Sequence, residues 1–213
     1  MSLDGTYTGL LASLADWMDR DDLASVTPDF VALFESNANT DAAIRTQFNR
    51  TSTLIPTTAS LDYISTPADY LGTDSAVIQI TSLSYKPLIP YGGASGLYTD
   101  FPGSAAGGVP QGFINLTGKL ELAPIPDSAY NIKLYYYQKV PALVTYSANW
   151  LLTNFPQIYL FGSLVAAEAY LGDDPRIAKW GSLYDNALQK LAGATDRNKY
   201  GGSTLSAKID AVV

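Results

Sequence analysis

The stretch "PQIYLFGSLVAAEAYLGDDP", Pro156–Pro175, is apolar on every side until two consecutive acids and a second proline end it. As a helix, residues 156–171 would be about 24 Å long, whereas a membrane span needs about 20 consecutive apolar residues. The stretch also carries Glu168, and Gln157 lies just inside its start. A helix that is apolar all round is typical of a protein core. We therefore expect a central core helix here and not a membrane span.

Helices are also predicted on both sides of this stretch. Residues 7–18 repeat apolar side chains at helical spacing, with Thr6 placed to cap the first turn. A second helix is predicted to begin with Thr27 as its N-cap and Pro28 in its first turn, and to run as far as Arg50. Asp174 is predicted to cap a last helix. Its apolar stripe consists of Ile177, Trp180, Tyr184, Leu188 and Leu191.

The middle of the chain is typical of β structure. Short apolar runs rich in Thr, Ser and Tyr follow Arg50, separated by Pro and Gly. Residues 91–112 are rich in glycine and are predicted to form a long loop. A hairpin is predicted to turn at Thr117–Gly118, and residues 130–137 alternate as in a half-buried strand.

The order of these elements predicts an α+β fold. We expect a helical bundle from the two ends of the chain, residues 1–50 and 141–195. An antiparallel β-rich domain, residues 51–140, is inserted between them. Residues 196–213 show no sustained pattern and are predicted to form an extended C-terminal tail.

The composition removes most catalytic chemistry. The chain of 213 residues contains no cysteine and no histidine, so thiolates, zinc–thiolate sites and His-dependent triads are excluded. The adjacent acids of "RDDL" and "GDDP" are most simply helix caps. We expect no enzyme activity, cofactor or metal, although a hydrolase that uses two carboxylates stays open. The net charge of −7 argues against tight binding of nucleic acid through bulk charge.

Two features leave alternatives open. In "LYYYQ", Leu134–Gln138, the side chains of Tyr135 and Tyr137 share a strand face and could stack on sugars or bases, or line an interface. Glu168, on its apolar helix, needs a cationic partner, a surface position or another chain. Arg176 and Lys179 follow closely and are the predicted partners.

Several stretches in order resemble one family. They are "TYTGLLASLADWMDRDDL" at 6–23, "TPDFVALFESNANTDAAIRT" at 27–46, "STPADYLGTDSAVI" at 65–78, "GKLELAPIPDSAYNIKLYYYQKVPAL" at 118–143 and "NWLLTNFPQIYLFGSLVAAEAYLGDDPRIAKWGSLYDNAL" at 149–188. Together they resemble the head–tail adaptor (connector) proteins of tailed bacteriophages, the group that includes tail tubular protein A. The last stretch is the most specific of them.

The resemblance implies a structural virion protein at the head–tail junction, made in the host cytoplasm. Copies would form a homo-oligomeric ring, a dodecamer, between the portal protein and a downstream tail or nozzle protein. DNA would pass through the lumen without sequence-specific binding. The C-terminal tail would reach the portal. The candidate portal contacts are Arg197, Lys199, Tyr200, Leu205, Lys208 and Ile209.

A ring subunit also needs two different faces that meet each other, which calls for apolar surface beyond that of its own core. We expect acidic side chains toward the lumen, where they would not grip DNA. A carbohydrate- or peptide-binding module that uses the tyrosines of the β-rich domain is the alternative function. The candidate subunit-interface residues are Tyr159, Phe161, Glu168, Tyr135 and Tyr137.

Overall fold

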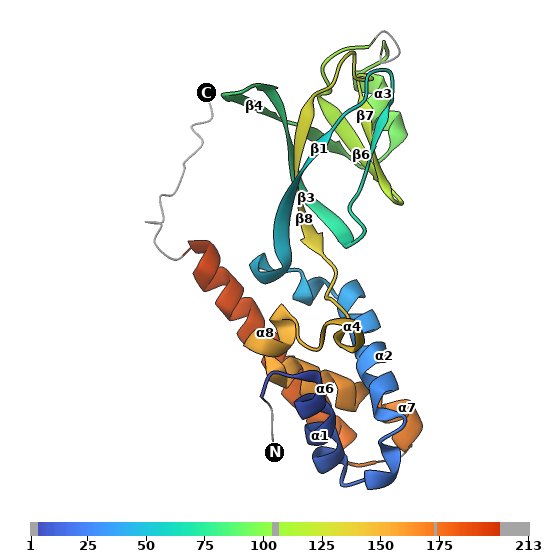
Figure 1. The fold of residues 1–213 in the computed structure, drawn as a ribbon, viewed down its shortest axis with the longest axis vertical. Helices are drawn as coiled ribbons and strands as arrows, with labels where there is room; N and C mark the ends of the chain where they lie inside the picture. Colours follow the sequence, from blue (N-terminus) through green and yellow to red (C-terminus); the bar gives the residue numbers. More distant parts are fainter. Residues whose placement is uncertain (1–3, 104–106, 173, 201–213) are drawn as a thin grey trace, which may run out of the picture. The chain divides into compact units, whose positions relative to one another are not determined.

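The computed structural model describes residues 4–103, 107–172 and 174–200, with side chains except at Asp21 and residues 197–200. The chain divides into two compact units. Unit 1 consists of Met1–Phe48 and Val140–Val213, and unit 2 of Asn49–Lys139. Helices and antiparallel or mixed sheets make up the structure, so the predicted α+β class is confirmed (Figure 1).

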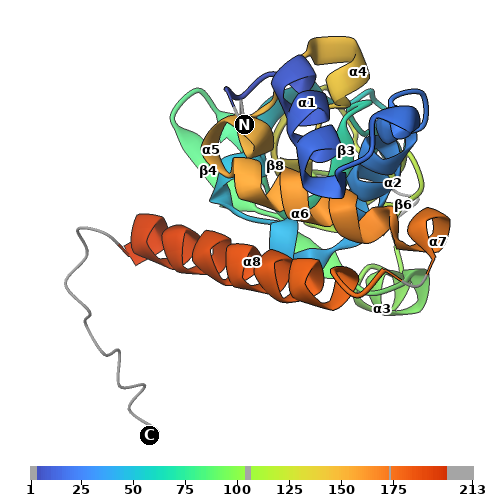
Figure 2. The ribbon, with the colours of Figure 1, turned by 90° about the horizontal axis from the view of Figure 1, so that it is seen from below.

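Unit 1 is helical. Its α-helices are α1 (Tyr7–Met18), α2 (Thr27–Thr40), α4 (Leu143–Tyr146), α5 (Trp150–Asn154), α6 (Pro156–Ala166), α7 (Glu168–Leu171) and α8 (Ile177–Tyr200). Two short 3₁₀ turns, η1 (Asp21–Leu23) and η2 (Ala42–Ile44), lie between them, and η3 (Gln47–Asn49) leads into unit 2. α6 packs against α1, α2, α5, α7 and α8, and Figure 2 shows α8 running alongside it.

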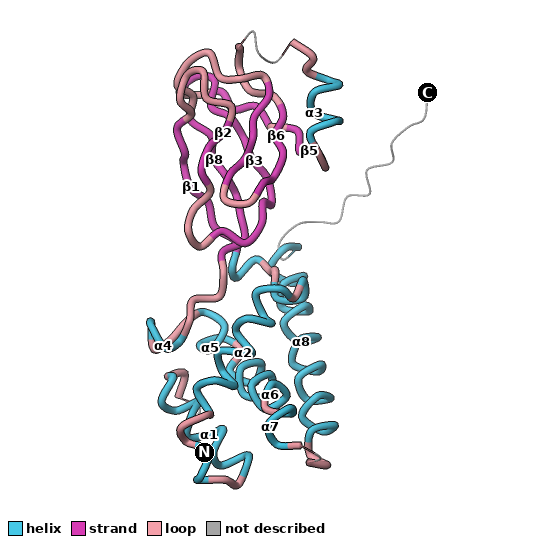
Figure 3. The backbone as a smooth tube through the Cα atoms, turned by 90° about the vertical axis from the view of Figure 1, so that its right-hand side faces the viewer, coloured by secondary structure: helices cyan, strands magenta, loops and turns pink. Residues whose placement is uncertain are grey.

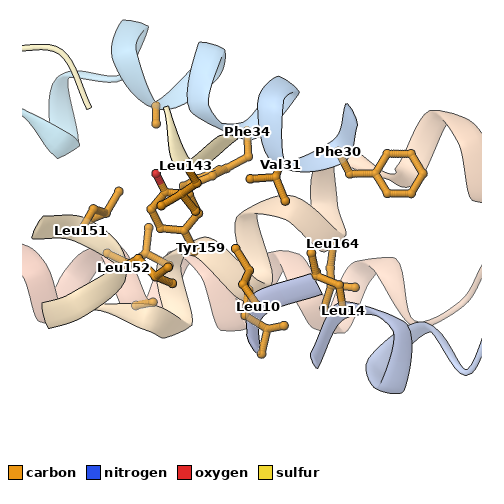
Figure 4. Close-up of a cluster of buried hydrophobic side chains, with 14 of the residues drawn as sticks. Leu10, Leu14, Phe30, Val31, Phe34, Leu143, Leu151, Leu152, Tyr159 and Leu164 are labelled. Carbon is orange, nitrogen blue, oxygen red and sulfur yellow. The ribbon is translucent and has the colours of Figure 1, made fainter. Parts of the chain in front are cut away.

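The core of unit 1 gathers around α6, as its sequence predicts. Ile158, Tyr159, Leu160 and Leu164 are buried together with apolar side chains of the surrounding helices (Figure 4). Gly162 lets α2 approach α6 closely, because a Cβ atom at this position would overlap the ring of Phe34. The central-core prediction for this helix is therefore confirmed. Among the described residues, none of the helices combines the length and the apolar content that a membrane span needs.

Local capping confirms one prediction and corrects another. The side chain of Thr6 accepts a hydrogen bond from the amide of Gly9 and caps α1 as expected. Thr27 does not cap α2; it is the first helical residue, and its hydroxyl donates to the carbonyl of Leu23 at 2.8 Å. The preceding turn, η1, ends so close to the start of α2 that the carbonyl of its last residue, Leu23, accepts the Thr27 hydroxyl. α2 also ends at Thr40 and not near Arg50, because 3₁₀ turns take over from Ala42.

Unit 2 contains two four-stranded sheets. The first has the order β1 (Arg50–Pro56), β8 (Asn131–Gln138), β3 (Tyr70–Thr81), β4 (Ser84–Pro87). The second has the order β2 (Tyr63–Ser65), β7 (Lys119–Ala123), β6 (Gly112–Leu116), β5 (Ile89–Tyr91). Side chains of both sheets meet in one buried cluster, so the unit is a small sandwich. β6 and β7 turn at Thr117–Gly118 as predicted, with Gly118 at φ +76°.

Two predictions about unit 2 need correction. Its sheets are not wholly antiparallel, because β5 pairs with β6 in parallel. The segment 91–112 is not only a loop, because it contains helix α3 (Ala94–Asp100), which lies against β5 and β6 (Figure 3). Leu97 is fully buried there and packs in a third small cluster with Ile114 and Ala123. This local core stabilises a helix that the glycine-rich sequence does not signal.

The C-terminal segment also differs from the expected one. α8 continues to Tyr200, so the prediction of an extended tail is wrong for residues 196–200. Arg197 and Lys199 are residue types that favour helix, and extending an existing helix costs much less than starting one. The consecutive glycines Gly201 and Gly202 follow in the sequence. The rest of the predicted tail, residues 201–213, lies outside the described residues.

Candidate interaction surfaces

The carboxylate of Glu35 lies at the centre of a buried hydrogen-bond network in unit 1. The hydroxyl of Tyr159 donates to Glu35 Oε1 at 3.1 Å, and the amide of Leu143 donates to the same oxygen at 2.9 Å. The side-chain amide of Asn149 donates to the hydroxyl of Tyr159 and to the carbonyl of Pro141. Burial raises the pKa of Glu35, while its two hydrogen bonds oppose that shift. The network joins α2 and α6 to residues 141–149, and the side chains of Glu35, Tyr159 and Asn149 in it are buried.

The structure places Tyr159, a predicted subunit-interface residue, in the interior of its own chain. It is fully buried within its own chain and packs edge-on against Phe34, with ring centroids 4.9 Å apart. The sequence prediction placed it at the subunit interface because its helix is apolar on every side. Phe161, on the same helix, is half-buried and packs edge-on against Trp17.

Glu168 lies at the start of α7 and is exposed. The predicted ion pair with Arg176 is not formed, because Arg176 pairs with Asp174 at 2.7 Å and donates to the carbonyls of Trp17 and Met18. α6 ends at Ala166, so Glu168 belongs to a separate helical turn at the surface. Water can solvate the carboxylate there, and a buried partner is not required.

The tyrosine-rich strand β8 is already engaged within unit 2. Arg50 and Lys133 both lie against the ring of Tyr135, at 5.6 and 5.3 Å from its centroid. The hydroxyl of Tyr137 donates to Asp74, which also pairs with Arg50. A sugar ring needs a free aromatic face to stack on. The two cations against its ring therefore do not favour the stacking of a sugar on Tyr135.

Several other tyrosines of unit 2 also donate to carboxylates. The described pairs are Tyr91 to Asp100, Tyr98 to Glu121, Tyr130 to Asp127 and Tyr136 to Asp69. Each pair uses a carboxylate that could otherwise serve as a catalytic acid or base. Among the described residues, no group of three acidic side chains could hold a metal ion.

The predicted portal-contact residues lie at or beyond the end of the described chain. Arg197, Lys199 and Tyr200 belong to α8, with side chains that are not described. Leu205, Lys208 and Ile209 lie outside the described residues.

The surface carries large apolar side chains that the sequence analysis missed. In unit 2 they gather on one hairpin and the strand after it, where Leu83 is 92% exposed and Ile80, Tyr85 and Ile89 are also exposed. In unit 1, Leu33 and Tyr170 flank a hollow of about 300 Å³. The hollow is lined by Val26, Asp29, Phe30, Leu33, Ala166, Ala169 and Tyr170. The only sequence signal for the hairpin is a run of apolar residues with almost no charge.

The comparisons with known proteins assign the family. The family described as "SU10 adaptor protein" matches residues 5–207, which is nearly the whole chain. No curated protein sequence matches it. The chain therefore belongs to the SU10 adaptor protein family and is a structural adaptor protein of a phage.

Proposed function

We propose that the chain is a head–tail adaptor of the virion, related to tail tubular protein A, which assembles as a ring between the portal protein and a downstream tail protein. DNA passes through the lumen of this ring. The domains proposed for this role are the helical bundle, the inserted β-rich domain and a C-terminal segment that contacts the portal. The observation that carries the proposal is the match to an adaptor family over residues 5–207.

The distribution of apolar side chains supports self-association. Large apolar residues are exposed on both units, at Leu33 and Tyr170 in unit 1 and around Leu83 in unit 2. Scattered exposed apolar residues are normal, but neighbouring ones on a single hairpin are typical of an interaction surface. A ring requires two different surfaces on each copy, and the chain has more than one candidate.

The portal contact is assigned to the end of α8 and the residues after it. Arg197 and Lys199 supply positive charge there, and Leu205 and Ile209 supply apolar side chains. A portal that binds this segment would bury apolar surface and pair with the cations. The acidic side chains that dominate the chain, with a net charge of −7, are proposed to face the lumen, where they would repel the phosphates of passing DNA.

Co-sedimentation with the portal of the same phage tests this proposal. The full chain should sediment with portal particles, and a chain that ends at Tyr200 should remain folded but lose most of the binding. Circular dichroism of the shortened chain is the control for folding. Equal binding by both chains would remove residues 201–213 from the contact, and no binding by the full chain would contradict the adaptor role.

A further inference from the structure

Residues 140–149, the segment by which the chain returns to unit 1, are fastened to α2, and we call them the strap. Two side chains one turn apart on α2 hold its backbone. Asn39 Oδ1 accepts the amide of Val140 at 2.8 Å, and Glu35 Oε1 accepts the amide of Leu143 at 2.9 Å. The side chain of Leu143 is fully buried in the core of unit 1 (Figure 4). The strap is therefore held both by polar groups of α2 and by the core.

The outer side of the strap is exposed and uncharged. Val144 and Tyr146, both on α4, are 77% and 66% exposed. Residues 140–167 contain no charged residue. The attachment of the strap to α2 therefore decides how these two large side chains are presented at the surface.

The acceptor of the Leu143 amide is a buried carboxylate without a cation. Glu35 is 7% exposed, and among the described residues it forms no ion pair. The titratable groups of other helices that interact with it are two tyrosines, Tyr159 on α6 and Tyr7 on α1. α4 and α5 carry no charge, and Asp29, on the same helix as Glu35, is also acidic. Ionised Glu35 is thus stabilised by hydrogen bonds from neutral donors only.

Such a site favours the protonated form of the carboxyl. Removing an unpaired carboxylate from water costs more free energy than hydrogen bonds from neutral groups return. Burial accordingly raises the pKa of Glu35 above its ordinary value of 4.5, and the hydrogen bonds from Leu143 and Tyr159 oppose that shift only in part. Lifting the strap from α2 exposes the carboxylate to water, because the Leu143 amide lies directly against Oε1.

The sign of the pH dependence follows from this difference. The seated strap binds the proton on Glu35 more tightly than the lifted strap, in which the carboxyl is hydrated. The stabilisation of the seated strap is therefore fully present below the ordinary glutamate pKa of 4.5, and it is lost as the pH rises through the raised pKa.

We propose that the strap is a proton-linked latch, which is held most firmly on α2 when Glu35 is protonated and loosens when Glu35 ionises. Ionisation frees the surface formed by Val144 and Tyr146 to move, and protonation fixes it against the bundle. The latch acts within one chain, whether or not copies assemble.

Hydrogen exchange of the Leu143 amide, followed by NMR on the full chain, measures the latch. Its protection factor, corrected for intrinsic exchange at each pH, is divided by that of the Ala167 amide, which donates to the carbonyl of Ser163 at the end of α6. This division removes changes in global stability. From about pH 4 to about pH 8 the ratio should fall by at least about threefold in the unmodified chain. Glu35→Gln keeps a carbonyl acceptor without the charge, so its ratio should stay constant.

A ratio that stays constant or rises with pH in the unmodified chain would overturn the latch, as would an equal fall in the Glu35→Gln variant. Circular dichroism shows whether that variant folds, and Tyr159→Phe provides a second test. This substitution removes a hydrogen bond that lowers the pKa of Glu35, so the fall should move to higher pH. A fall at the same or a lower pH would also contradict the latch.

Discussion

The hydroxyl of Tyr159 on α6 donates to the carboxylate of Glu35 on α2 across the interior of unit 1, at 3.1 Å. Glu35 also accepts the amide of Leu143 at 2.9 Å, so a single carboxylate oxygen holds two buried donors from the C-terminal half of the unit. These two hydrogen bonds tie α2 to residues that follow Glu35 by more than 100 positions in the sequence.

Glu35→Ala tests the importance of this carboxylate. It leaves the Tyr159 hydroxyl and the Leu143 amide without their acceptor, and each buried unsatisfied donor costs about 1–3 kcal/mol. The free energy of unfolding should therefore fall by at least about 2 kcal/mol, as measured by urea denaturation. The exposed Glu168→Ala is the matched control and should change stability by less than about 0.5 kcal/mol. Equal effects of the two substitutions would show that the network does not stabilise the unit.

Gly162→Ala tests the close approach of α2 and α6. The added Cβ would overlap the ring of Phe34, which also packs edge-on against Tyr159 and Tyr184. Overpacking of this kind costs about 1–3 kcal/mol. Gly181→Ala, on α8 with open space around the new Cβ, should instead leave stability unchanged or raise it by up to about 1 kcal/mol. Thermal unfolding of both variants distinguishes the two sites, and a stable Gly162→Ala protein would refute the close contact.

Alkaline pH should destabilise unit 2. Burial and the hydrogen bond to Asp69 raise the pKa of Tyr136 to about 12, and the hydrogen bond to Glu121 raises the pKa of Tyr98 to about 12. An unfolded tyrosine has a pKa of about 10. The stabilisation is therefore fully present below about pH 10 and is lost as the pH rises toward 12.

Absorbance at 295 nm, which reports tyrosinate, and circular dichroism should follow this loss together. Tyr136→Phe removes one of these titrating groups, so the free energy of unfolding of the variant should fall less steeply with pH over the same range. An identical pH profile for the variant and the unmodified chain would contradict the assignment to Tyr136.

Local sequence signals predicted the parts of the fold that depend on neighbouring residues. The Thr6 cap, the turn at Thr117–Gly118 and the alternation along β8 follow from short-range rules and are observed. The stripe of the last helix also buries Trp180 as expected. These features need no knowledge of distant contacts.

Features set by distant contacts were not predictable in this way. α3 forms because Leu97 meets Ile114 and Ala123, which are far away in the sequence. Tyr159 was predicted at the subunit interface, because an all-apolar helix does not reveal which of its side chains pack into its own core. The exposed hairpin around Leu83 resembles an ordinary apolar strand until its edge position is known.

Negative-stain electron microscopy of the chain mixed with the portal of its own phage tests the central claim most directly. The adaptor role predicts a ring of copies seated on the narrow end of each portal, and the ring gives the symmetry. Portals that stay bare at high concentrations of folded protein would contradict it.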